Sequence, residues 1–135
     1  MAATEETLGR VPLFSGVKTK DLKKLGKRMQ ERGFSEGDTI TMEGETGLGF
    51  FVIEEGNATV SRNGRIVRSL GPGDFFGEIA LIDKGPRSAT VVASTDMRCR
   101  GMTAWEFKPF VEEHPDVAWG LMETLVERLR AAEAA

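Results

Sequence analysis

A chain of 135 residues that is 40% hydrophobic and carries a net charge of −3 is long enough for one globular domain with a single core. The near balance of 18 basic and 21 acidic side chains excludes a strongly basic surface, so we predict that the protein does not bind nucleic acid. The sequence contains no apolar run of bilayer length, and residues 1–6 are acidic rather than signal-like, so we expect no membrane segment and a cytoplasmic location.

Helical spacing appears first between residues 18 and 31. Leu22, Leu25 and Met29 recur there among lysines and arginines, which predicts an amphipathic helix. The apolar segment before it, residues 11–14, is expected to anchor that helix to the core. We therefore assign residues 1–32 to an N-terminal helical segment.

Short strands separated by turn residues are predicted over residues 33–102. The clearest hairpin is marked by Asn63 and Gly64, which lie between the strand-like segments 59–62 and 65–68. Many short strands at regular spacing are typical of a sandwich or a jelly-roll barrel. The sequence therefore predicts a mainly β domain flanked by helices.

Two helices are predicted after the strands. The spacing of Thr103 and Glu106 fits a capping box and predicts a helix over residues 103–112, which Pro109 must shorten or kink. Apolar residues at helical spacing predict a last helix over residues 115–131. They form one stripe of Val117, Leu121, Leu125 and Leu129, and a second of Ala118, Met122 and Val126. This wide face predicts packing on the core, and a lid or a dimer surface is the alternative.

The sequence holds one cysteine and one histidine, and neither fits a reactive site. Cys99 lies in an alternating, strand-like segment, and a lone cysteine forms no intrachain disulfide or thiolate cluster. His114 precedes Pro115, which predicts a turn before the last helix. A metal-dependent jelly-roll enzyme needs a cluster of histidines, so we predict no catalytic residue, no metal site and no cofactor.

Residues 76–90 form the most specific passage of the chain. Gly77 has no side chain, so a ligand can approach its backbone closely. Arg87 supplies a planar guanidinium that can bind two phosphate oxygens together. The N–H groups of Ile79 and Ala80, at the start of a short helical turn, are predicted to be unpaired donors for an anion.

Glu78 is the unexpected member of this passage because a carboxylate repels a phosphate. Its position is explained if it accepts hydrogen bonds from a ribose hydroxyl while Arg87 balances the phosphate charge. Taken singly, these residues have simpler interpretations as a surface cation, a capping carboxylate and a turn glycine. In this order they predict a site for a small molecule that carries both a phosphate and a ribose.

The passage resembles the phosphate-binding cassette of cyclic nucleotide-binding domains, the module of the bacterial catabolite activator protein, of the regulatory subunits of cyclic-nucleotide-dependent kinases and of nucleotide-gated channels. Further segments that resemble the family are residues 11–14, 37–40, 43–45, 51–56 and 70–75. The resemblance implies an eight-stranded jelly-roll β-barrel with an N-terminal helix and two C-terminal helices. It makes residues 1–135 a single domain, with the barrel at 33–102, the cassette at 76–90, and hinge and lid helices at 103–135.

The resemblance also implies ligand contacts. Glu78 would bind the ribose 2′-hydroxyl and Arg87 the cyclic phosphate. The other implied contacts are the backbone of Gly77, Ile79, Ala80 and Ala89, the hydroxyl of Ser88 on the phosphate or base, and Val60 and Val67 as a wall for the base. Phe51 stands where the family commonly has tyrosine, a position outside this cradle.

The function implied by the resemblance is that of a bacterial stand-alone sensor rather than an enzyme. We predict cAMP as the ligand, and cGMP is the alternative because the Ser88 hydroxyl also suits a guanine amino group. No output domain is expected after the last helix, so the signal would pass through the C-terminal helices to a separate effector protein, or to a second copy in a homodimer. The alternative function is an interaction module whose vestigial pocket binds no nucleotide.

Overall fold

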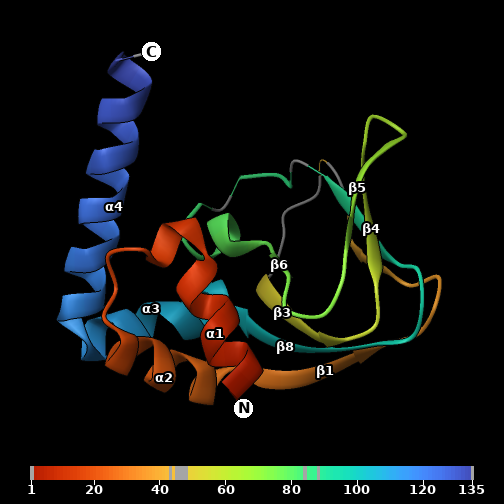
Figure 1. The fold of residues 1–135 in the computed structure, drawn as a ribbon, viewed down its shortest axis with the longest axis horizontal. Coiled ribbons are helices and arrows are strands. Elements are labelled where there is room, and N and C mark those ends of the chain that lie inside the picture. The colour runs from red at the N-terminus through yellow and green to blue at the C-terminus, as the bar shows by residue number, and fades with distance from the viewer. Residues whose placement is uncertain (1, 43, 45–48, 84, 88, 135) are drawn as a thin grey trace.

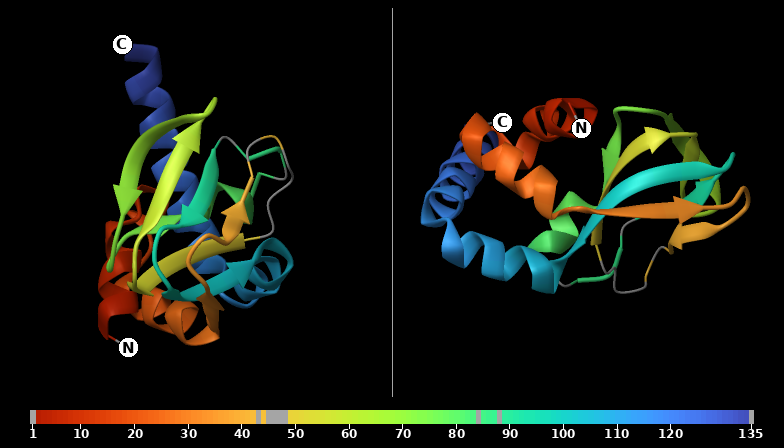
Figure 2. Two further views of the ribbon diagram at one scale, coloured as in Figure 1. Left: turned by 90° about the vertical axis from the view of Figure 1, so that its right-hand side faces the viewer. Right: turned by 90° about the horizontal axis from the view of Figure 1, so that it is seen from below.

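The computed structural model describes residues 2–42, 44, 49–83, 85–87 and 89–134. Helices from both ends of the chain gather on one side of the molecule, and the strands form the other side (Figures 1 and 2). In the described part of the chain, no helix is both long enough and apolar enough to cross a bilayer.

Two four-stranded antiparallel sheets form the β domain. The strands are β1 (Gln30–Phe34), β2 (Thr39–Thr41), β3 (Gly49–Glu55), β4 (Ala58–Arg62), β5 (Arg65–Leu70), β6 (Phe75–Phe76), β7 (Thr90–Ala93) and β8 (Met97–Thr103). One sheet has the order β1-β8-β3-β6 and the other β2-β7-β4-β5, which is the strand order of a jelly roll. The predicted mainly β fold with flanking helices is therefore confirmed.

The turn between β4 and β5 is the predicted hairpin. Asn63 and Gly64 have φ values of 54° and 76°, both in the left-handed region that a tight two-residue hairpin of type I′ requires. Arg62 and Arg65 face each other directly beside this turn. The local Asn-Gly pair was therefore sufficient to locate this feature from the sequence.

Two hydrophobic clusters share the interior. The first lies between the two sheets and consists of Ile53, Ala58, Val60, Leu70, Phe76, Val91, Ala93, Met97 and Cys99. The second joins the helices to the edge of the β domain, and its members include Leu8, Phe14, Leu25, Phe50, Leu81, Met102, Phe107, Phe110 and Leu121. Because Leu81 belongs to this second cluster, the segment that follows β6 is packed against the helices as well as against β3.

The N-terminal region contains helix α1 (Ala2–Arg10), the short 3-10 helix η1 (Pro12–Phe14) and helix α2 (Thr19–Arg28). The expected anchoring role of residues 11–14 is confirmed, since Val11, Leu13 and Phe14 are fully buried. The helix predicted over residues 18–31 ends earlier than expected, because the chain pairs with β8 from Gln30 onward. Helix propensity at that point is overridden by strand pairing.

Helix α3 (Ala104–Glu113) begins as predicted. Thr103 Oγ1 accepts a hydrogen bond from the Glu106 N–H at 3.3 Å, and the Glu106 carboxylate accepts one from the Thr103 N–H at 2.9 Å, which completes the capping box. The expected shortening at Pro109 is wrong, because the helix runs through it to Glu113. Phe107 and Phe110 are buried on either side of the proline and hold the helix against the core.

Helix α4 (Pro115–Ala134) packs on the molecule along only part of its length. Its buried positions end at Thr124, whose Oγ1 accepts a hydrogen bond from the Gly16 N–H at 3.0 Å. The prediction that the whole apolar stripe packs on the core is therefore wrong for its second half, since Leu125 and Leu129 are 45% and 58% exposed. The C-terminal end of α4 extends beyond the surface that covers the rest of the helix (Figure 1).

Candidate functional site: a cavity between the cassette and the β4–β5 hairpin

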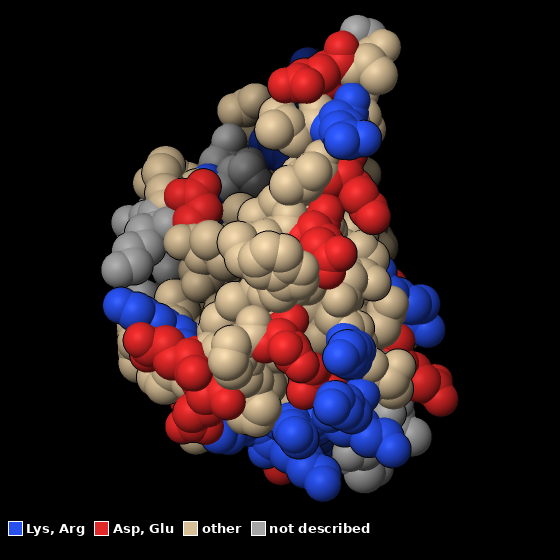
Figure 3. All heavy atoms as spheres, turned by 90° about the vertical axis from the view of Figure 1, so that its left-hand side faces the viewer, with Lys and Arg blue, Asp and Glu red and all other residues tan. Residues whose placement is uncertain are grey.

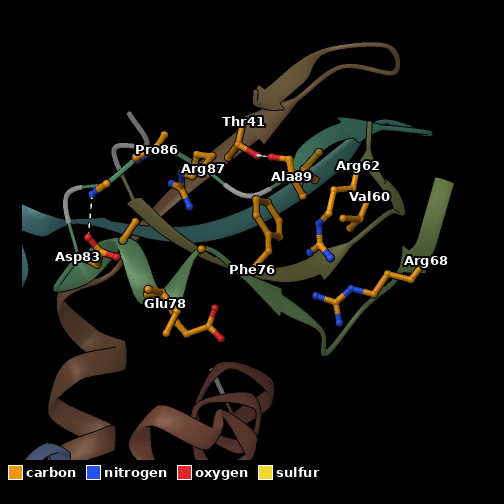
Figure 4. Close-up of a pocket in the computed structure, with 15 residues that line it drawn as sticks. Thr41, Val60, Arg62, Arg68, Phe76, Glu78, Asp83, Pro86, Arg87 and Ala89 are labelled. Carbon is orange, nitrogen blue, oxygen red and sulfur yellow. Dashed lines mark hydrogen bonds between the residues drawn. The ribbon is translucent and has the colours of Figure 1, made fainter. Parts of the chain in front are cut away.

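A cavity of about 280 Å³ opens between residues 76–90 and the β4–β5 hairpin (Figure 4). Its volume lies near the lower end of small-molecule sites, which suits a ligand of mononucleotide size. The described lining residues are Thr41, Val60, Arg62, Arg68, Phe76, Gly77, Glu78, Ile79, Ala80, Asp83, Gly85, Pro86, Arg87, Ala89 and Val91. Helix α4 contributes no residue to this described lining, so it does not close over the cavity in this structure.

Gly77 forms the corner at which β6 turns into the short 3-10 helix η2 (Glu78–Leu81). Its φ of +87° is in the left-handed region, where a side chain is strained. A Cβ at this position would also collide with the carbonyl oxygen of Gly49 and lie 2.6 Å from Nη1 of Arg87. The glycine therefore lets the backbone and the arginine side chain approach each other in the wall of the cavity.

Arg87 is fixed in position by contacts with two other segments. Its Nη2 donates a hydrogen bond to the Gly49 carbonyl at 2.5 Å, and its own carbonyl accepts one from the Gly44 N–H at 2.9 Å. Its Nε is buried and has no hydrogen-bond partner within the described part of the chain. The guanidinium therefore has donor capacity left for an acceptor in the cavity.

The charge of Arg87 is held in a partly desolvated place. Burial lowers the pKa of the guanidinium from its ordinary value, and the nearby Glu78 carboxylate opposes that shift. Arginine stays protonated even when its pKa falls, so the site keeps a fixed positive charge. A second carboxylate of the lining, Asp83, is engaged locally, because its Oδ1 accepts a hydrogen bond from the Gly85 N–H at 2.9 Å.

The prediction of an unpaired donor at Ala80 is wrong. The Ala80 N–H donates to the Gly77 carbonyl at 3.1 Å, because η2 is a 3-10 turn that closes this bond within itself. Ala80 still lines the cavity. Its N–H is therefore used by the turn, and the Arg87 guanidinium is the main donor group at this end of the cavity.

A scan against family models matches residues 31–114 to the cyclic nucleotide-binding domain. The chain belongs to the cyclic nucleotide-binding domain family. The match spans the sheets, the cassette and α3, so the predicted family is confirmed. Members of this family are regulatory or sensor domains rather than enzymes.

Curated relatives agree with this assignment. The chain is 30% identical over 131 residues to a CRP-like cAMP-activated global transcriptional regulator of Mycobacterium tuberculosis, which covers 93% of this chain and 58% of the regulator. It is 35% identical over 115 residues to a cAMP-dependent protein kinase regulatory subunit of Aspergillus niger, which covers 84% of this chain and 28% of the subunit. The chain thus spans little more than half the length of the mycobacterial regulator and less than a third of the fungal subunit.

Solved structures show the same fold. The N-terminal domain of a transcriptional regulator from Streptomyces coelicolor A3(2) superposes with a TM-score of 0.84 at 30% identity, over 96% of both chains. The catabolite activator protein of Thermus thermophilus superposes with a TM-score of 0.70 at 30% identity, over 92% of this chain and 61% of that one. The cyclic nucleotide-binding domain fold therefore covers this chain almost from end to end.

The far end of the cavity differs from the expectation for this cyclic nucleotide-binding domain. Val60 lines the cavity as predicted, but Val67 does not and is 49% exposed. The cause is a β-bulge: Ser61 pairs with Ile66, whereas Val60 pairs with Arg68, so Val67 is the extra residue of β5. The bulge brings the Arg68 side chain to the cavity in its place.

The structure brings together most of the residues that the sequence assigned to the ligand. The lining includes Gly77, Glu78, Ile79, Ala80, Arg87, Ala89 and Val60. Ser88 lies outside the described residues, as do residues 43 and 45 of the matching segment 43–45. The sequence analysis missed Arg62 and Arg68, whose only signal was the basic composition of the hairpin.

Cys99 and His114, for which the sequence predicts no reactive role, do not line the cavity. Cys99 is fully buried between the sheets, and burial together with the Glu54 charge raises the pKa of its thiol to about 12, which disfavours the nucleophilic thiolate. His114 ends α3, where its Nδ1 donates to the Phe110 carbonyl at 2.9 Å. Among the described residues, no three histidine, cysteine or carboxylate side chains lie together as a group that could hold a metal ion.

Proposed function

We propose that this chain binds a 3′,5′-cyclic nucleotide in the cavity and passes the binding signal through α3 and α4 to a separate protein. The observation that carries the proposal is the half-buried Arg87, which is fixed by Gly49 and keeps a buried Nε without a described partner. A cyclic phosphodiester supplies the anionic oxygens that this guanidinium lacks. A vestigial pocket has no reason to keep a desolvated cation beside an open cavity.

The division of labour between the two charged cassette residues follows from their donor and acceptor chemistry. Arg87 has only donors, so it is suited to the phosphate, and a carboxylate such as Glu78 has only acceptors, so it is suited to the ribose 2′-hydroxyl. Both side chains line the same cavity. A ligand that joins a phosphate and a ribose in one ring satisfies both side chains at once.

Transmission starts from the way η2 is packed. Leu81, at the end of η2, is buried in the helical cluster together with Phe107 and Phe110 of α3. A ligand that draws Glu78 and Gly77 toward its sugar and phosphate must therefore also shift the contact between Leu81 and α3. Ligand binding changes the populations of two arrangements of α3 and α4, and the differential contact is this apolar one.

We propose that the exposed half of α4 is the surface that a partner protein contacts. The exposed large apolar residues on and near it are Trp105, Trp119, Met122, Leu125, Val126 and Leu129. On the face of the molecule that carries α4, uncharged side chains lie along the helix beside acidic ones (Figure 3). A group of exposed large apolar side chains of this kind marks an interaction site, for an effector protein or a second copy of the chain.

Isothermal titration calorimetry tests the binding part of the proposal. cAMP and cGMP are titrated into the chain, with 5′-AMP as the control that lacks the cyclic phosphodiester. We expect at least one cyclic nucleotide to bind with a dissociation constant well below about a millimolar, a threshold near −4 kcal/mol. If neither binds in that range, the chain is an interaction module with a vestigial pocket.

Amide hydrogen exchange tests the transmission part. We expect saturating cyclic nucleotide to change the exchange rates of α3 and α4 as well as those of the cassette, because Leu81 connects them. The β1 strand, which contributes no residue to the described cavity lining, provides an internal control in the same sample. Changes confined to the cassette would show that the ligand binds without signalling through these helices.

A further inference from the structure

We propose that Arg68 selects the base of the bound nucleotide, and that it favours guanine over adenine. This inference rests on the proposed function, since it concerns the part of the same cavity that faces away from the phosphate. It follows from three features of the hairpin: the register of β4 and β5, the position of the Arg68 side chain, and the hydrogen-bonding chemistry of guanidinium.

The register of the hairpin determines which residue of β5 lies opposite Val60. Arg62 pairs with Arg65 and Ser61 with Ile66, so an unbroken hairpin would place Val67 opposite Val60. The bulge shifts the pairing by one residue, and Arg68 takes that place instead. Directly paired residues of antiparallel strands project from the same face of the sheet, so the Arg68 side chain shares the cavity face with Val60.

The surroundings of the Arg68 side chain leave it accessible to a ligand. Arg62 and Arg68 extend from the hairpin on one side of the Phe76 ring, and Arg87 lies on the other (Figure 4). Arg68 forms no ion pair with any carboxylate in the described part of the chain. Its guanidinium is exposed at the mouth of the cavity and is therefore free to reach a ligand.

The hydrogen-bonding chemistry of the Arg68 guanidinium favours guanine. A guanidinium has five N–H donors and no acceptor, so it needs acceptors on the base. Guanine presents two adjacent acceptors, O6 and N7, and arginine binds this pair with two parallel hydrogen bonds. Adenine presents an amino group in place of O6, and that donor faces the donors of the arginine. A purine held by Arg87 at its phosphate and by Arg68 at its base edge is therefore better satisfied as guanine.

This preference differs from the prediction of cAMP, which the sequence favoured over cGMP in spite of the Ser88 hydroxyl. A serine hydroxyl both donates and accepts, so it discriminates weakly between bases. The proposed preference for guanine also differs from the ligand named for the mycobacterial and fungal relatives, which is cAMP.

Titration with four cyclic nucleotides tests the inference. We expect cGMP to bind roughly tenfold more tightly than cAMP, within the range that a bidentate arginine–guanine pair provides. Inosine 3′,5′-cyclic monophosphate keeps O6 and N7 but lacks the 2-amino group, and it should bind like cGMP. The 7-deaza analogue of cGMP loses one of the two acceptors and should bind several-fold more weakly than cGMP.

Arg68→Gln, with Arg65→Gln as its matched control, tests whether Arg68 is the residue that selects the base. Glutamine both donates and accepts and pairs with adenine N6 and N7, so the ratio of cGMP affinity to cAMP affinity should fall about tenfold in this variant. Arg65→Gln removes the same charge from the same hairpin, but Arg65 does not line the cavity, so the ratio should stay unchanged. Both positions are exposed, and circular dichroism checks that both variants fold.

The outcomes separate this inference from the proposed function. If no cyclic nucleotide binds the wild-type chain, the proposed function fails and the inference fails with it. If cAMP binds as tightly as cGMP, or if Arg68→Gln leaves the ratio unchanged, the inference is overturned while the proposed function stands. If the inosine nucleotide binds like cAMP, the 2-amino group is recognised instead, and Arg68 is not the selecting residue.

Discussion

Arg87 and Arg68 line the same cavity, but the chain positions them in different ways. Arg87 is half-buried, its guanidinium donates to the Gly49 carbonyl, and Gly77 leaves room for it. Arg68 stands on an exposed edge strand and is placed only by the register of the hairpin. The difference shows that the cassette end holds one charge in one place, whereas the hairpin end is open to variation.

The contrast has a physical reason. A hydrogen bond to a charged group is strongest where water is excluded, so the proposed phosphate site at the cassette end gains from burial and from backbone contacts that fix the arginine. Base selection requires only a difference in affinity between two purines, which an exposed side chain with the right donors can supply. Changes to the cassette backbone should therefore affect folding and binding together, and changes at the hairpin should affect one property at a time.

Gly77→Ala should have the largest effect. The alanine would have to adopt a φ of +87° and would collide with the Gly49 carbonyl and Arg87. We expect the free energy of unfolding to fall by about 2 kcal/mol or more, and nucleotide affinity to fall as Arg87 is displaced. Urea unfolding and calorimetry measure the two effects. Wild-type stability in this variant would show that the cassette backbone is not constrained as described.

Arg87→Ala should leave the fold intact and weaken cyclic nucleotide binding by at least tenfold. The reason is the loss of the one charge-assisted phosphate donor that the described lining places at the cassette end. Calorimetry measures the dissociation constant. Arg65→Ala, on the hairpin but outside the cavity lining, is the control for the loss of one positive charge. Retained affinity in Arg87→Ala would mean that the phosphate is bound elsewhere.

Glu78→Gln should weaken binding of ribose-containing nucleotides by about fivefold, since a neutral acceptor replaces a charged one. The matched ligand is 2′-deoxy-cAMP, which should bind the wild-type chain more weakly by a similar factor. Because the substitution weakens the same contact that the deoxy ligand removes, their effects should not add. Additive losses would show that Glu78 does not contact the 2′-hydroxyl.

Gly64→Ala tests the hairpin end with the same substitution as at Gly77. Gly64 also has a positive φ, of +76°, but a Cβ there would meet no atom within 4 Å. We expect only the cost of the strained backbone, about 1 kcal/mol of unfolding free energy, and unchanged nucleotide affinity. Equal losses of stability in the Gly64 and Gly77 variants would remove the proposed contrast between the two ends.

Glu106→Gln should have the smallest effect, and it should depend on pH. Hydrogen bonds from the backbone and side chain of Thr103 lower the pKa of Glu106 from its ordinary value of 4.5. A lowered folded-state pKa adds stability that is present above pH 4.5 and is lost as the pH falls through the folded value. The substitution should cost no more than about 1 kcal/mol at pH 7 and less near pH 3.

Urea unfolding of the wild type and of Glu106→Gln at the two pH values measures this dependence. Glu112→Gln is the control, because it removes a carboxylate from the same helix outside the capping box. The effect bears on the cassette end, since α3 supports Leu81 through Phe107. A difference between wild type and Glu106→Gln that does not shrink at low pH would show that the carboxylate of the capping box is not the stabilising group.

Features that depend on neighbouring residues in the chain were predictable. The Asn63–Gly64 turn and the Thr103–Glu106 capping box are local geometries that a few adjacent side chains specify. The order of Gly77, Glu78 and Arg87 likewise predicted which residues line the cavity. Each of these statements needed no knowledge of a distant segment.

Features that depend on distant segments were decided by the tertiary structure. The Gly49 carbonyl fixes Arg87 from 38 positions away, and Thr124 meets Gly16 across 108 positions, so no local pattern indicates either contact. The point at which α4 loses its cover depends on how far the N-terminal segment reaches. An apolar stripe shows that a helix has a face to bury, and only the packed neighbours decide how much of that face is buried.

The β5 strand shows the division most clearly. The sequence determined that a hairpin forms at Asn63 and that an arginine follows two apolar residues on its second strand. Whether Val67 or Arg68 faces the cavity depends on a one-residue shift in pairing, because side chains alternate between the faces of a sheet. The sequence thus determined the cassette end of the cavity, and the register of two paired strands decided which side chain of β5 faces the cavity.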